Sequence, residues 1–441
     1  MSQSSFGRLL SRAIASEVSM FTRYFDRVIQ WAPQKGDEGY LLECIDAPIK
    51  ERIETGSALP DLREEKDKRT ALLLNGNLNY SFDIQGLLED IKKSLSRTSR
   101  IVVVAYNPYM RGLVRMANRL GLHSGEVPTT FLTRSSLLHL GKLAGFEVVK
   151  QRSSVFLPIP FEKLSRPLNR FLSLIPGMRL FSAVEVIVLR PQIAEPKHSL
   201  PSLSIIIPAR NEKGNIENAI SRLPELGAEL EIIFVEGHSS DGTWEEIERV
   251  QKLHEHSVSI KSFKQQGKGK ADAVRLGATH ATKDLITILD ADLTMPPELL
   301  PLFYQAYCQG QADFINGNRL LYPMEGEAMQ FLNHLGNLFF AKALSAVLEV
   351  SIGDSLCGTK LFLRADYQRF VRWRAHFGEF DPFGDFELLF PAAILGLGII
   401  DIPVRYRART YGSTNISRFR HGAMLLKMTL VGLFRVRIGD A

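Results

Sequence analysis

Two aspartates stand one residue apart directly after an apolar run in "LITILDADLTMPP", residues 285–297. If the chain stays extended through Ala291, the two-residue period of a strand points the side chains of Asp290 and Asp292 in the same direction. Two converging carboxylates repel each other unless a cation lies between them, and a hard divalent ion prefers oxygen ligands. The pattern therefore indicates a site for Mg²⁺ or Mn²⁺, which in turn could bridge a diphosphate. The alternative is that both acids only form a turn and cap the helix that follows.

Polar side chains also end the two apolar runs that come earlier in this half of the chain. "SIIIPARNE" ends in Arg210, Asn211 and Glu212, and "EIIFVEGHSSDGTW" places Glu236 at the end of its apolar part. Residues 241–243 have the types that suit a turn and a helix cap. In an open parallel sheet the loops after the strands converge, and helix N-termini present free N–H groups there. Three such ends in succession predict a ligand site at one edge of a sheet.

Strand-like and helix-like patterns alternate around these residues. Short apolar runs in "LSIIIP", "LEIIFVEG", "DLITILDAD" and "ADFINGNR" are typical of buried strands. Helical patterns separate them, as in "NEKGNIENAISRLPEL", residues 211–226. This part of the chain is therefore predicted to be α/β, with a mostly parallel sheet.

The first part of the chain shows the same alternation. Strands are predicted at 70–77, 100–108, 145–152 and 184–189, and helices at 83–95 and 133–144. Between the two parts, "RPQIAEPKHSLPS" carries three prolines and several polar residues, which is typical of a domain boundary. We predict an N-terminal α/β unit over 1–190, a linker over 191–202 and a C-terminal domain over 203–441.

The composition is that of a globular protein with a preference for anions. A chain of 441 residues with 45% apolar and 23% charged residues suits two folded domains. Its net charge of +6 favours nucleotides or lipid phosphates as ligands. No nucleic-acid partner is expected, because the sequence has no zinc-finger spacing or RNA-binding signature. Three widely separated cysteines offer neither a disulfide framework nor a metal site, which favours a reducing compartment such as the cytoplasm.

The C-terminal stretch "SRFRHGAMLLKMTLVGLFRVR", residues 417–437, interrupts a nearly continuous apolar sequence with five basic residues. Such a segment could lie on an anionic membrane, or it could pack as a terminal helix with solvated charges. No run reaches the roughly 18 apolar residues needed to span a bilayer, and charged residues interrupt the N-terminal segment where a secretory signal would be apolar. We therefore expect a protein at the cytoplasmic face of a membrane, bound peripherally.

Five motifs occur in the order and approximate spacing of the family 2 glycosyltransferases: "SIIIPARNE", "VEGHSSDGTW", "GKADAVRLG", "ILDADL" and "INGNR". Within that family the chain most resembles the polyprenyl-phosphate branch, of the dolichol-phosphate mannose synthase type, over about residues 203–425. The resemblance implies a GT-A fold and a nucleotide-sugar donor. It also implies Mg²⁺ or Mn²⁺ held by Asp290 and Asp292 against the donor diphosphate, and a lipid-phosphate or glycan acceptor.

The resemblance also assigns side chains to the donor, motif by motif. The residues that would border the nucleotide-sugar are Pro208, Arg210, Glu212, Glu236, Lys270, Arg275, Asp290, Arg319 and Arg409. The cations among them would offset phosphate charge, and the alternative is that they are only solvated at the surface. The family's common acidic pair is replaced by Glu236 and Gly237, which leaves the nucleotide unspecified.

Three later segments resemble the acceptor end of the family's site. "GDSLCGTKLF" would present Lys360 to the acceptor, and "FDPFGDFELL" would supply the catalytic acid, with Asp385 as first choice and Glu387 as second. "YRARTYGSTN" resembles a loop near the phosphates, with Asn415 where the lipid-phosphate branch usually has lysine. A sugar hydroxyl needs a carboxylate base, whereas a lipid phosphate is already ionised. Asp385 thus favours a hydroxyl acceptor, unless it only caps the following helix. Lys360 favours a lipid-phosphate acceptor, and we prefer this second interpretation.

The predicted reaction is a single in-line displacement at the anomeric carbon, with inversion. Two other classes stay open: a protein that binds nucleotide-sugar or glycolipid without turnover, and a bifunctional methyltransferase. Segments such as "LLNGNLNYSFDIQGLLEDIKKSL" loosely resemble the distal half of a class I methyltransferase. The first unit lacks the glycine-rich cofactor turn, and residues 1–69 look too short and too charged to supply the missing half. We interpret it as a degenerate module and do not expect S-adenosylmethionine as a cofactor.

Overall fold

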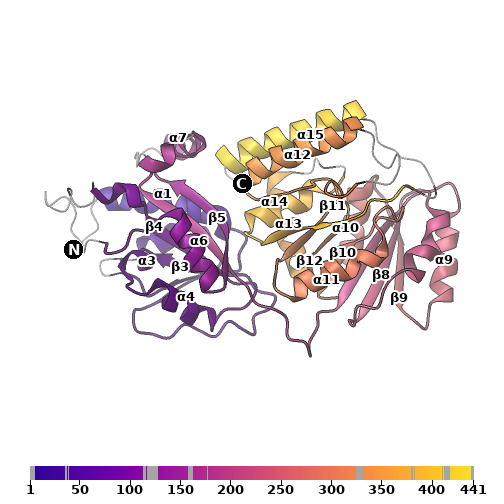
Figure 1. Ribbon diagram of the computed structural model, residues 1–441, viewed down its shortest axis with the longest axis horizontal. Coiled ribbons are helices and arrows are strands. Elements are labelled where there is room, and N and C mark those ends of the chain that lie inside the picture. The colour runs from indigo at the N-terminus through magenta and orange to yellow at the C-terminus, as the bar shows by residue number, and fades with distance from the viewer. Residues whose placement is uncertain are drawn as a thin grey trace. The chain divides into compact units, whose positions relative to one another are not determined.

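The computed structural model divides the chain into two compact units (Figure 1). The residues it describes are 5–34, 37, 39–112, 116, 128–156, 162–175, 177–323, 331–378, 381, 383–409, 411 and 418–438. The first unit comprises Met1–Ile193, Ile394–Gly396 and Leu433–Ala441, and the second comprises Ala194–Ala393 and Leu397–Gly432. The two short segments that return to the first unit come from the predicted C-terminal domain, so the structural division differs from the predicted one there.

A six-stranded sheet forms the centre of the first unit. Its strands are β1 (Arg27–Trp31), β2 (Lys50–Ile53), β3 (Thr70–Asn75), β4 (Arg100–Tyr106), β5 (Phe146–Ser154) and β6 (Val184–Pro191). They lie in the order β2-β1-β3-β4-β6-β5. The first four strands of this order are parallel, whereas β6 is antiparallel to both of its neighbours. The four strands predicted from the sequence of this unit are confirmed as β3, β4, β5 and β6.

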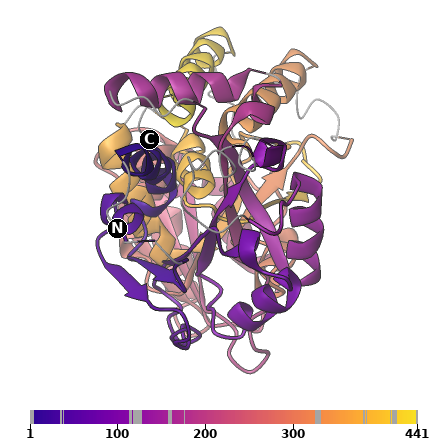
Figure 2. The same cartoon turned by 90° about the vertical axis from the view of Figure 1, so that its left-hand side faces the viewer.

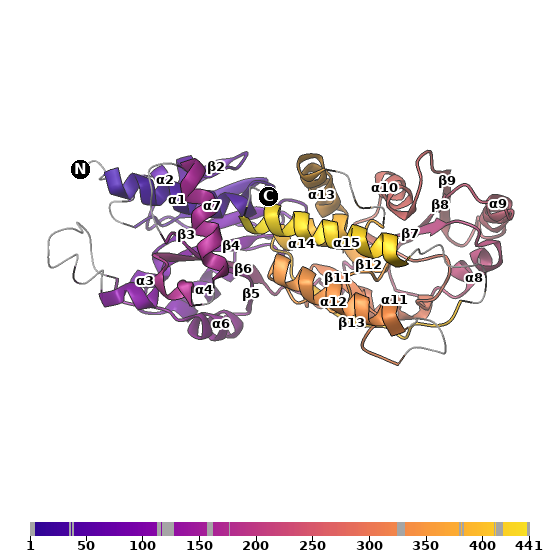
Figure 3. The same cartoon turned by 90° about the horizontal axis from the view of Figure 1, so that it is seen from above.

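Helices cover both faces of this sheet, as Figures 2 and 3 show. The helical elements of the unit are α1 (Ser5–Thr22), α2 (Tyr40–Cys44), α3 (Asn77–Tyr80), α4 (Ile84–Lys92), η1 (Pro108–Met110), α6 (Arg134–Leu143), α7 (Glu162–Leu174), η2 (Met178–Phe181) and η5 (Leu433–Ile438). Both predicted helices are present as α4 and α6. Asp83 begins α4 by accepting a hydrogen bond from the N–H of Gly86 (2.8 Å), because a free N–H in the first turn needs an acceptor.

Residues 1–69 contribute more to the first sheet than expected. They were expected to be too short and too charged to supply the missing half of the unit, but both β1 and β2 come from them. Val28 and Ile29 in β1 are fully buried, and the adjacent charge of Arg27 is paired with Glu65 at 2.9 Å. Two buried aliphatic side chains and the ladder hydrogen bonds are enough to place a short strand on an existing sheet, even when its neighbours are charged. Whether the unit is related to methyltransferases stays a prediction.

The second unit is built on a seven-stranded, mostly parallel sheet. Its strands are β7 (Leu203–Ala209), β8 (Leu230–Glu236), β9 (Ser259–Lys264), β10 (Leu285–Ile288), β11 (Phe314–Asn318), β12 (Lys360–Leu363) and β13 (Ile399–Pro403). They lie in the order β13-β11-β12-β10-β7-β8-β9. Only β12 is antiparallel to its neighbours among the described strand pairs, and it lies between β11 and β10. The predicted fold class, α/β with a mostly parallel sheet, is confirmed.

The helices of the second unit connect these strands. They are η3 (Lys213–Asn215), α8 (Ile216–Ser221), α9 (Thr243–Leu253), α10 (Lys270–His280), η4 (Pro297–Leu299), α11 (Leu300–Cys308), α12 (Phe331–Leu348), α13 (Arg364–Phe377), α14 (Phe386–Ile394) and α15 (Arg418–Gly432). The helix predicted over 211–226 is shorter than expected, because α8 ends at Ser221, close before Pro224. The double proline acts as predicted: Pro296 is the N-cap of η4 and Pro297 is its first residue.

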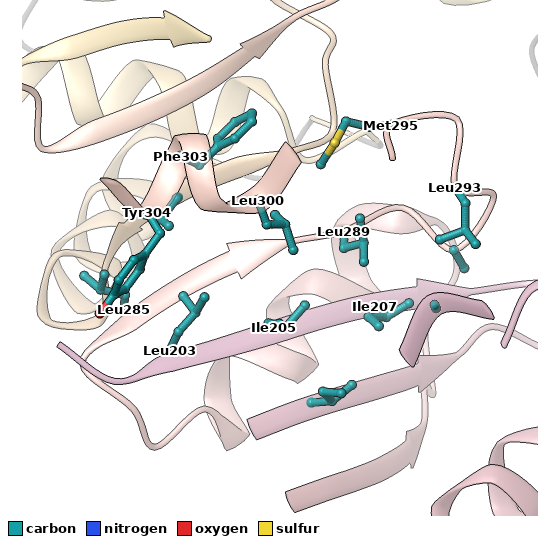
Figure 4. Packing of buried hydrophobic residues seen from close by; sticks show 14 of the residues in the cluster. Leu203, Ile205, Ile207, Leu285, Leu289, Leu293, Met295, Leu300, Phe303 and Tyr304 are labelled. Carbon is teal, nitrogen blue, oxygen red and sulfur yellow. The ribbon is translucent and has the colours of Figure 1, made fainter. Parts of the chain in front are cut away.

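The apolar runs that predicted strands contribute to an apolar core on one face of the second sheet. Leu203, Ile205 and Ile207 of β7 point to the same face, because strand side chains alternate. Figure 4 shows Leu300 and Phe303 lying over them. Helices also cover the opposite face, where α10 contacts β7 and β8. Since both faces are covered, these strands are continuously apolar until they reach the edge of the sheet.

Glu231, near the start of β8, is a buried acid at the edge opposite the strand ends. Its carboxylate accepts hydrogen bonds from the hydroxyl of Ser204 (2.5 Å) and from the N–H and hydroxyl of Thr282 (2.6 and 2.9 Å). Lys261 adds an ion pair at 2.7 Å. Burial alone would raise the pKa of Glu231, but Lys261 and these hydrogen bonds lower it from 4.5 to about 2.

Glu231→Gln is expected to lower the free energy of unfolding by about 2–4 kcal/mol at neutral pH, because the amide loses the ion pair and turns N–H groups toward donors. The folded-state pKa of about 2 lies below the ordinary 4.5, so the carboxylate stabilises the fold above pH 4.5 and loses that effect as the pH falls toward 2. Urea unfolding of both proteins at neutral and acid pH measures this effect. The difference in unfolding free energy between the two proteins is expected to become smaller in acid. An unchanged difference would contradict the stabilising role assigned to the Glu231 carboxylate.

Candidate active site

The topology of the second sheet brings several chain segments to one edge. β7, β8 and β10 are parallel, so the residues that follow Ala209, Glu236 and Ile288 lie there. β11 ends at the same edge, because β12 is antiparallel to both β10 and β11. For the same reason β12 begins at that edge, and its first residue is Lys360. The carboxyl ends of parallel strands are where open α/β sheets bind ligands.

The two aspartates after β10 lie in a turn and not on an extended strand. The N–H of Leu293 donates to the carbonyl of Asp290 (3.1 Å), and Leu293 has a φ of 52°. Extension does not persist through Ala291, so the condition for parallel side chains is not met. Asp292 is partly a turn former, because its Oδ1 accepts hydrogen bonds from the N–H (3.1 Å) and the hydroxyl (2.8 Å) of Thr294. The other oxygen of Asp292, Oδ2, contacts Arg409.

Asp290 forms an ion pair with Lys270, the first residue of α10. Burial would raise the pKa of Asp290, but the positive charges of Lys270, Lys360 and Arg319 hold it below its ordinary value. Conversely, burial would lower the pKa of Lys270, but nearby acids, chiefly Asp290, raise it. Gly358 packs directly on this pair, and a Cβ at its position would collide with both charged groups. A glycine is needed there because the backbone approaches the two side chains so closely.

Arg409 connects the acids that follow two neighbouring strands. Its Nη2 lies 2.6 Å from Asp292 Oδ2, and its Nη1 lies 3.3 Å from Glu212 Oε1. Glu212 is buried and also accepts a hydrogen bond from the side chain of Asn215 (2.8 Å). Burial, followed by the negative charge of Asp292, raises the pKa of Glu212 to about 7, although Asn215 and Arg409 oppose the shift.

The segment that carries Arg409 also reaches the end of β8. The hydroxyl of Tyr411 donates to Asp241 Oδ2 (3.1 Å), and the other oxygen of Asp241 accepts from the N–H of Thr243 (3.0 Å). This turn is the one predicted from residue types, with Gly242 as the N-cap of α9 at a φ of 84°. The segment therefore contacts residues after three strands. The prediction for Asn415 falls on 412–417, which lie outside the described residues.

Lys360 and Asp385 form a buried pair beside these groups. The side chain of Lys360 is completely buried, and its Nζ contacts the carbonyl of Cys357 and lies 2.5 Å from Asp385 Oδ1. Asp385 is 6% exposed. Lys360, predicted to meet the acceptor, thus has its ammonium group turned to Asp385. Asp385 in turn does not cap α14 with its carboxylate; Asp381 does, accepting the N–H groups of Phe386 (2.7 Å) and Glu387 (3.1 Å).

Arg319, which follows β11, is held rigidly by Asp354. Two guanidinium nitrogens of Arg319 contact the two carboxylate oxygens of Asp354 at 2.6 and 2.9 Å. The guanidinium also lies over the ring of Tyr406, 5.3 Å from its centroid. Asp354 raises the pKa of Arg319 despite burial, and Arg319 keeps Asp354 ionised. A bidentate pair of this kind fixes the orientation of the arginine.

Arg275 and Glu387 form an ion pair with each other. Arg275 was predicted to contact the donor, and Glu387 was the second choice for the catalytic acid. Nε of Arg275 lies 3.0 Å from Glu387 Oε2, and Arg374 contacts the same oxygen at 3.3 Å. Glu387 is 8% exposed, so its carboxylate is enclosed by two cations. Both contacts of Glu387 thus go to arginine side chains within the fold. Asp385, in contrast, acts electrostatically on Lys270. Which of the two acids is catalytic stays a prediction.

The remaining predicted donor residues lie at the ends of β7 and β8. Pro208 is half-buried within β7, and Arg210 is exposed just after it. Glu236, the last residue of β8, is buried, and its Oε1 accepts a hydrogen bond from the N–H of Ser239 (2.5 Å). Glu236 therefore shapes the loop after β8, and its contact with the nucleotide stays a prediction.

Comparisons with known proteins identify the part of the chain that carries this edge. Residues 204–370 match the family model described as Glycosyl transferase family 2, and this span includes Lys270, Asp290, Asp292 and Lys360. Residues 204–370 thus form a family 2 glycosyltransferase domain by this match, and below the name glycosyltransferase domain covers the second unit, which contains them. The glycosyltransferase domain is similar to the dolichyl-phosphate hexose transferase of Haloferax volcanii, with 25% identity over 232 residues, or 52% of this chain and 93% of that protein.

Solved structures with similar chains include two glycosyltransferases. One is glucosyl-3-phosphoglycerate synthase from Mycobacterium tuberculosis in complex with Mn²⁺, UDP and glucosyl-3-phosphoglycerate: 19% identity, TM-score 0.38, covering 55% of this chain and 82% of that one. The other is a mannosyltransferase from Pyrobaculum calidifontis in complex with GDP-Man and Mn²⁺: 19% identity, TM-score 0.35, covering 55% of this chain and 65% of that one.

The glycosyltransferase domain offers a divalent ion two carboxylates. Among the described residues, no group of three or more His, Cys, Asp or Glu side chains is placed to hold a metal. Asp290 and Asp292 nevertheless suit an ion such as Mg²⁺, which typically takes one or two carboxylates and completes its coordination with phosphate and water. Each of the two acids faces a cation in the structure, Lys270 or Arg409, and these cations would share the carboxylates with a bound ion. The chemistry of the two carboxylates suits the predicted metal.

Sequence patterns did not single out several residues that shape the site of the glycosyltransferase domain. Asp354 orients Arg319, Asp381 caps α14, and Gly358 allows Lys270 to reach Asp290. A signal for Asp381 was present, because an aspartate shortly before a helical pattern is a common N-cap. The pairing of Asp354 with Arg319 had no local signal, since 35 positions separate them.

Proposed function

We propose that the glycosyltransferase domain transfers a hexose from a nucleotide-sugar to a lipid-linked phosphate, using Mg²⁺ or Mn²⁺ held by Asp290 and Asp292. The observation that carries the proposal is the arrangement of Lys270 and Arg409 against these two acids at the edge where β7, β8 and β10 end. The similarity to a dolichyl-phosphate hexose transferase over 93% of that protein's length supports a lipid-phosphate acceptor. The net charge of +6 also suits a donor and an acceptor that are both anionic.

The side chains of this edge have complementary tasks in the proposed reaction. A bound divalent ion would act as a Lewis acid that stabilises the departing nucleoside diphosphate. Lys270 and Arg409 lie against the metal-binding acids and would share the phosphate charge. Arg319 is oriented in advance by Asp354, so little side-chain freedom is lost when it meets an anion.

The acceptor determines whether Asp385 must act as a base. A lipid phosphate is already ionised near neutral pH and needs orientation and charge balance only. A sugar hydroxyl has to lose its proton, and a carboxylate must be within reach of it. Transfer to a hydroxyl is therefore the second candidate. The position of Asp385 favours it, because this acid acts electrostatically on Lys270 next to Asp290.

Purified chain incubated with a panel of UDP- and GDP-hexoses is expected to convert a short-chain polyprenyl phosphate into its hexosyl derivative. The expected product gains the mass of one hexose residue in mass spectrometry, and only when a divalent ion is present. A glycolipid with free hydroxyl groups serves as the comparison acceptor. Product from the glycolipid alone would favour the hydroxyl candidate. Donor binding without any product would identify a binding protein instead of an enzyme.

A further inference from the structure

Helices α12 and α15 lie side by side at the surface of the second unit. They contact each other, and Figures 1 and 3 both show them adjacent and roughly aligned. Each also has an inner, buried face. The buried apolar residues of the two helices are Ala341, Leu344, Val347, Leu348, Leu425 and Met428. The pair is therefore anchored to the second unit, and its outer face is a separate surface.

The outer face of each helix is also apolar. On α12, Leu335 is 54% exposed and Phe339 is 56% exposed, one helical turn apart. On α15, Leu426 is 45% exposed and Leu430 is 46% exposed, again one turn apart. Single exposed apolar residues are common, but four large ones on two helices that contact each other are more typical of a binding surface. We call these four residues the helix-pair patch.

The charges of the two helices have one sign. Across α12 and α15 the sequence contains Lys342, Arg418, Arg420 and Lys427 but no aspartate or glutamate. Lys342 and Lys427 are exposed close to the helix-pair patch. Lys342 lies three positions after Phe339, and Lys427 lies three positions before Leu430, so each is about one helical turn from a patch residue. Exposed leucine and phenylalanine with lysine beside them are typical of helices that lie in the plane of an anionic bilayer surface. A protein partner with an apolar groove would not by itself explain the complete absence of acids.

Both helices adjoin the candidate active site in sequence. α12 begins 12 residues after Arg319 and ends six residues before Asp354, the two members of the bidentate pair. α15 begins nine residues after Arg409. Among the described residues no helix combines the length and apolar character needed to cross a bilayer. Contact through the outer face is compatible with this, because such a helix lies along the surface instead of crossing it.

We propose that α12 and α15 together form a docking platform for an anionic lipid bilayer, with the helix-pair patch inserted among the acyl chains and Lys342 and Lys427 near the headgroups. The platform holds the chain at the surface in which a lipid-linked acceptor is dissolved. Only this last step, delivery of the acceptor, rests on the function proposed above. Binding to the bilayer depends on the exposed side chains alone.

Flotation of the purified full chain with vesicles tests the platform. Vesicles of phosphatidylcholine mixed with phosphatidylglycerol are compared with phosphatidylcholine alone, and the variant is Leu426→Glu/Leu430→Glu. The control is Leu253→Glu on α9, which replaces a leucine that is also exposed, at 58%. Wild type and control are expected to float with the anionic vesicles, more weakly at high salt. The double variant is expected to bind at least about tenfold more weakly, because charge replaces inserted apolar surface.

Several outcomes would overturn the platform. One is wild-type chain that does not float, and another is a double variant that floats as well as the control. A third outcome is that the wild type is a dimer and does not bind vesicles, while the double variant is a monomer. In that case the helix-pair patch would join two copies of the chain. Transfer to a short-chain polyprenyl phosphate in detergent is measured in parallel and is expected to be equal in all three proteins. If only the double variant loses this transfer, the platform is also overturned. If all three proteins show the expected vesicle binding but none transfers sugar, only the proposed function is overturned.

Discussion

Replacing Asp290 or Asp292 by asparagine is expected to lower kcat for sugar transfer by about 1,000-fold or more, while the fold is retained. Asp290 and Asp292 are the two carboxylates assigned to the metal, and an amide oxygen is a weaker ligand for a hard divalent ion. Asp290→Asn also leaves Lys270 against a neutral amide, and Asp292→Asn leaves Arg409 paired with Glu212 alone. The charge of the departing diphosphate is then less well balanced.

The measurement combines turnover with metal binding. Product formation is followed at saturating donor, and Mn²⁺ binding in the presence of a nucleoside diphosphate is followed by its electron paramagnetic resonance signal. Glu298→Gln is the matched control, because this partly exposed acid of η4 contacts Arg222 (2.8 Å) and not the strand-end acids. The control is expected to retain both signals. Undiminished turnover in either aspartate variant would exclude the metal assignment, and thermal unfolding near the wild-type temperature would show that a loss is not caused by misfolding.

Lys360→Met is expected to lower the free energy of unfolding by about 3–5 kcal/mol, because it leaves Asp385 as a buried charge without its partner. The two groups are 0% and 9% exposed as side chains and lie 2.5 Å apart. A lysine that served only the acceptor would instead raise the KM for the acceptor and leave stability nearly unchanged. Denaturant unfolding and the acceptor KM therefore separate a positioning role of Lys360 from the acceptor-binding role predicted from the sequence.

A second substitution makes this test specific to the ion pair. In Lys360→Met/Asp385→Leu both charges are removed together, so most of the lost stability is expected to return, since a buried pair replaced by apolar groups is often neutral in stability. Lys252→Met on α9 is the control, because this lysine is exposed. A double variant as unstable as Lys360→Met would contradict the pairing. Equal stability of Lys360→Met and wild type would restore the acceptor interpretation.

Local sequence patterns predicted most of the strands and the acids and cations that meet at one edge of the second sheet. Apolar runs such as "LSIIIP" and "LITIL" became β7 and β10, because a strand covered on both faces must be apolar throughout. The turn at Asp241 and Gly242 followed from residue types, and the double proline ended the segment after β10. β1 and β2 escaped prediction, since their few apolar residues are surrounded by charges that are paired only in the folded unit.

By itself the sequence determined the apolar strands such as β7 and β10, the placement of Asp290 and Asp292 after an apolar strand, and the order of the family 2 motifs. Only the tertiary structure decided which charges meet: Lys360 with Asp385, Arg275 with Glu387, and Arg409 with Asp292. These partners are separated by 25 to 117 positions. Local periodicity determines the face of a strand on which a side chain lies. Which side chains meet at the edge of the sheet depends instead on the order and direction of the strands. The antiparallel direction of β12 brings Lys360 to the edge where the parallel strands end.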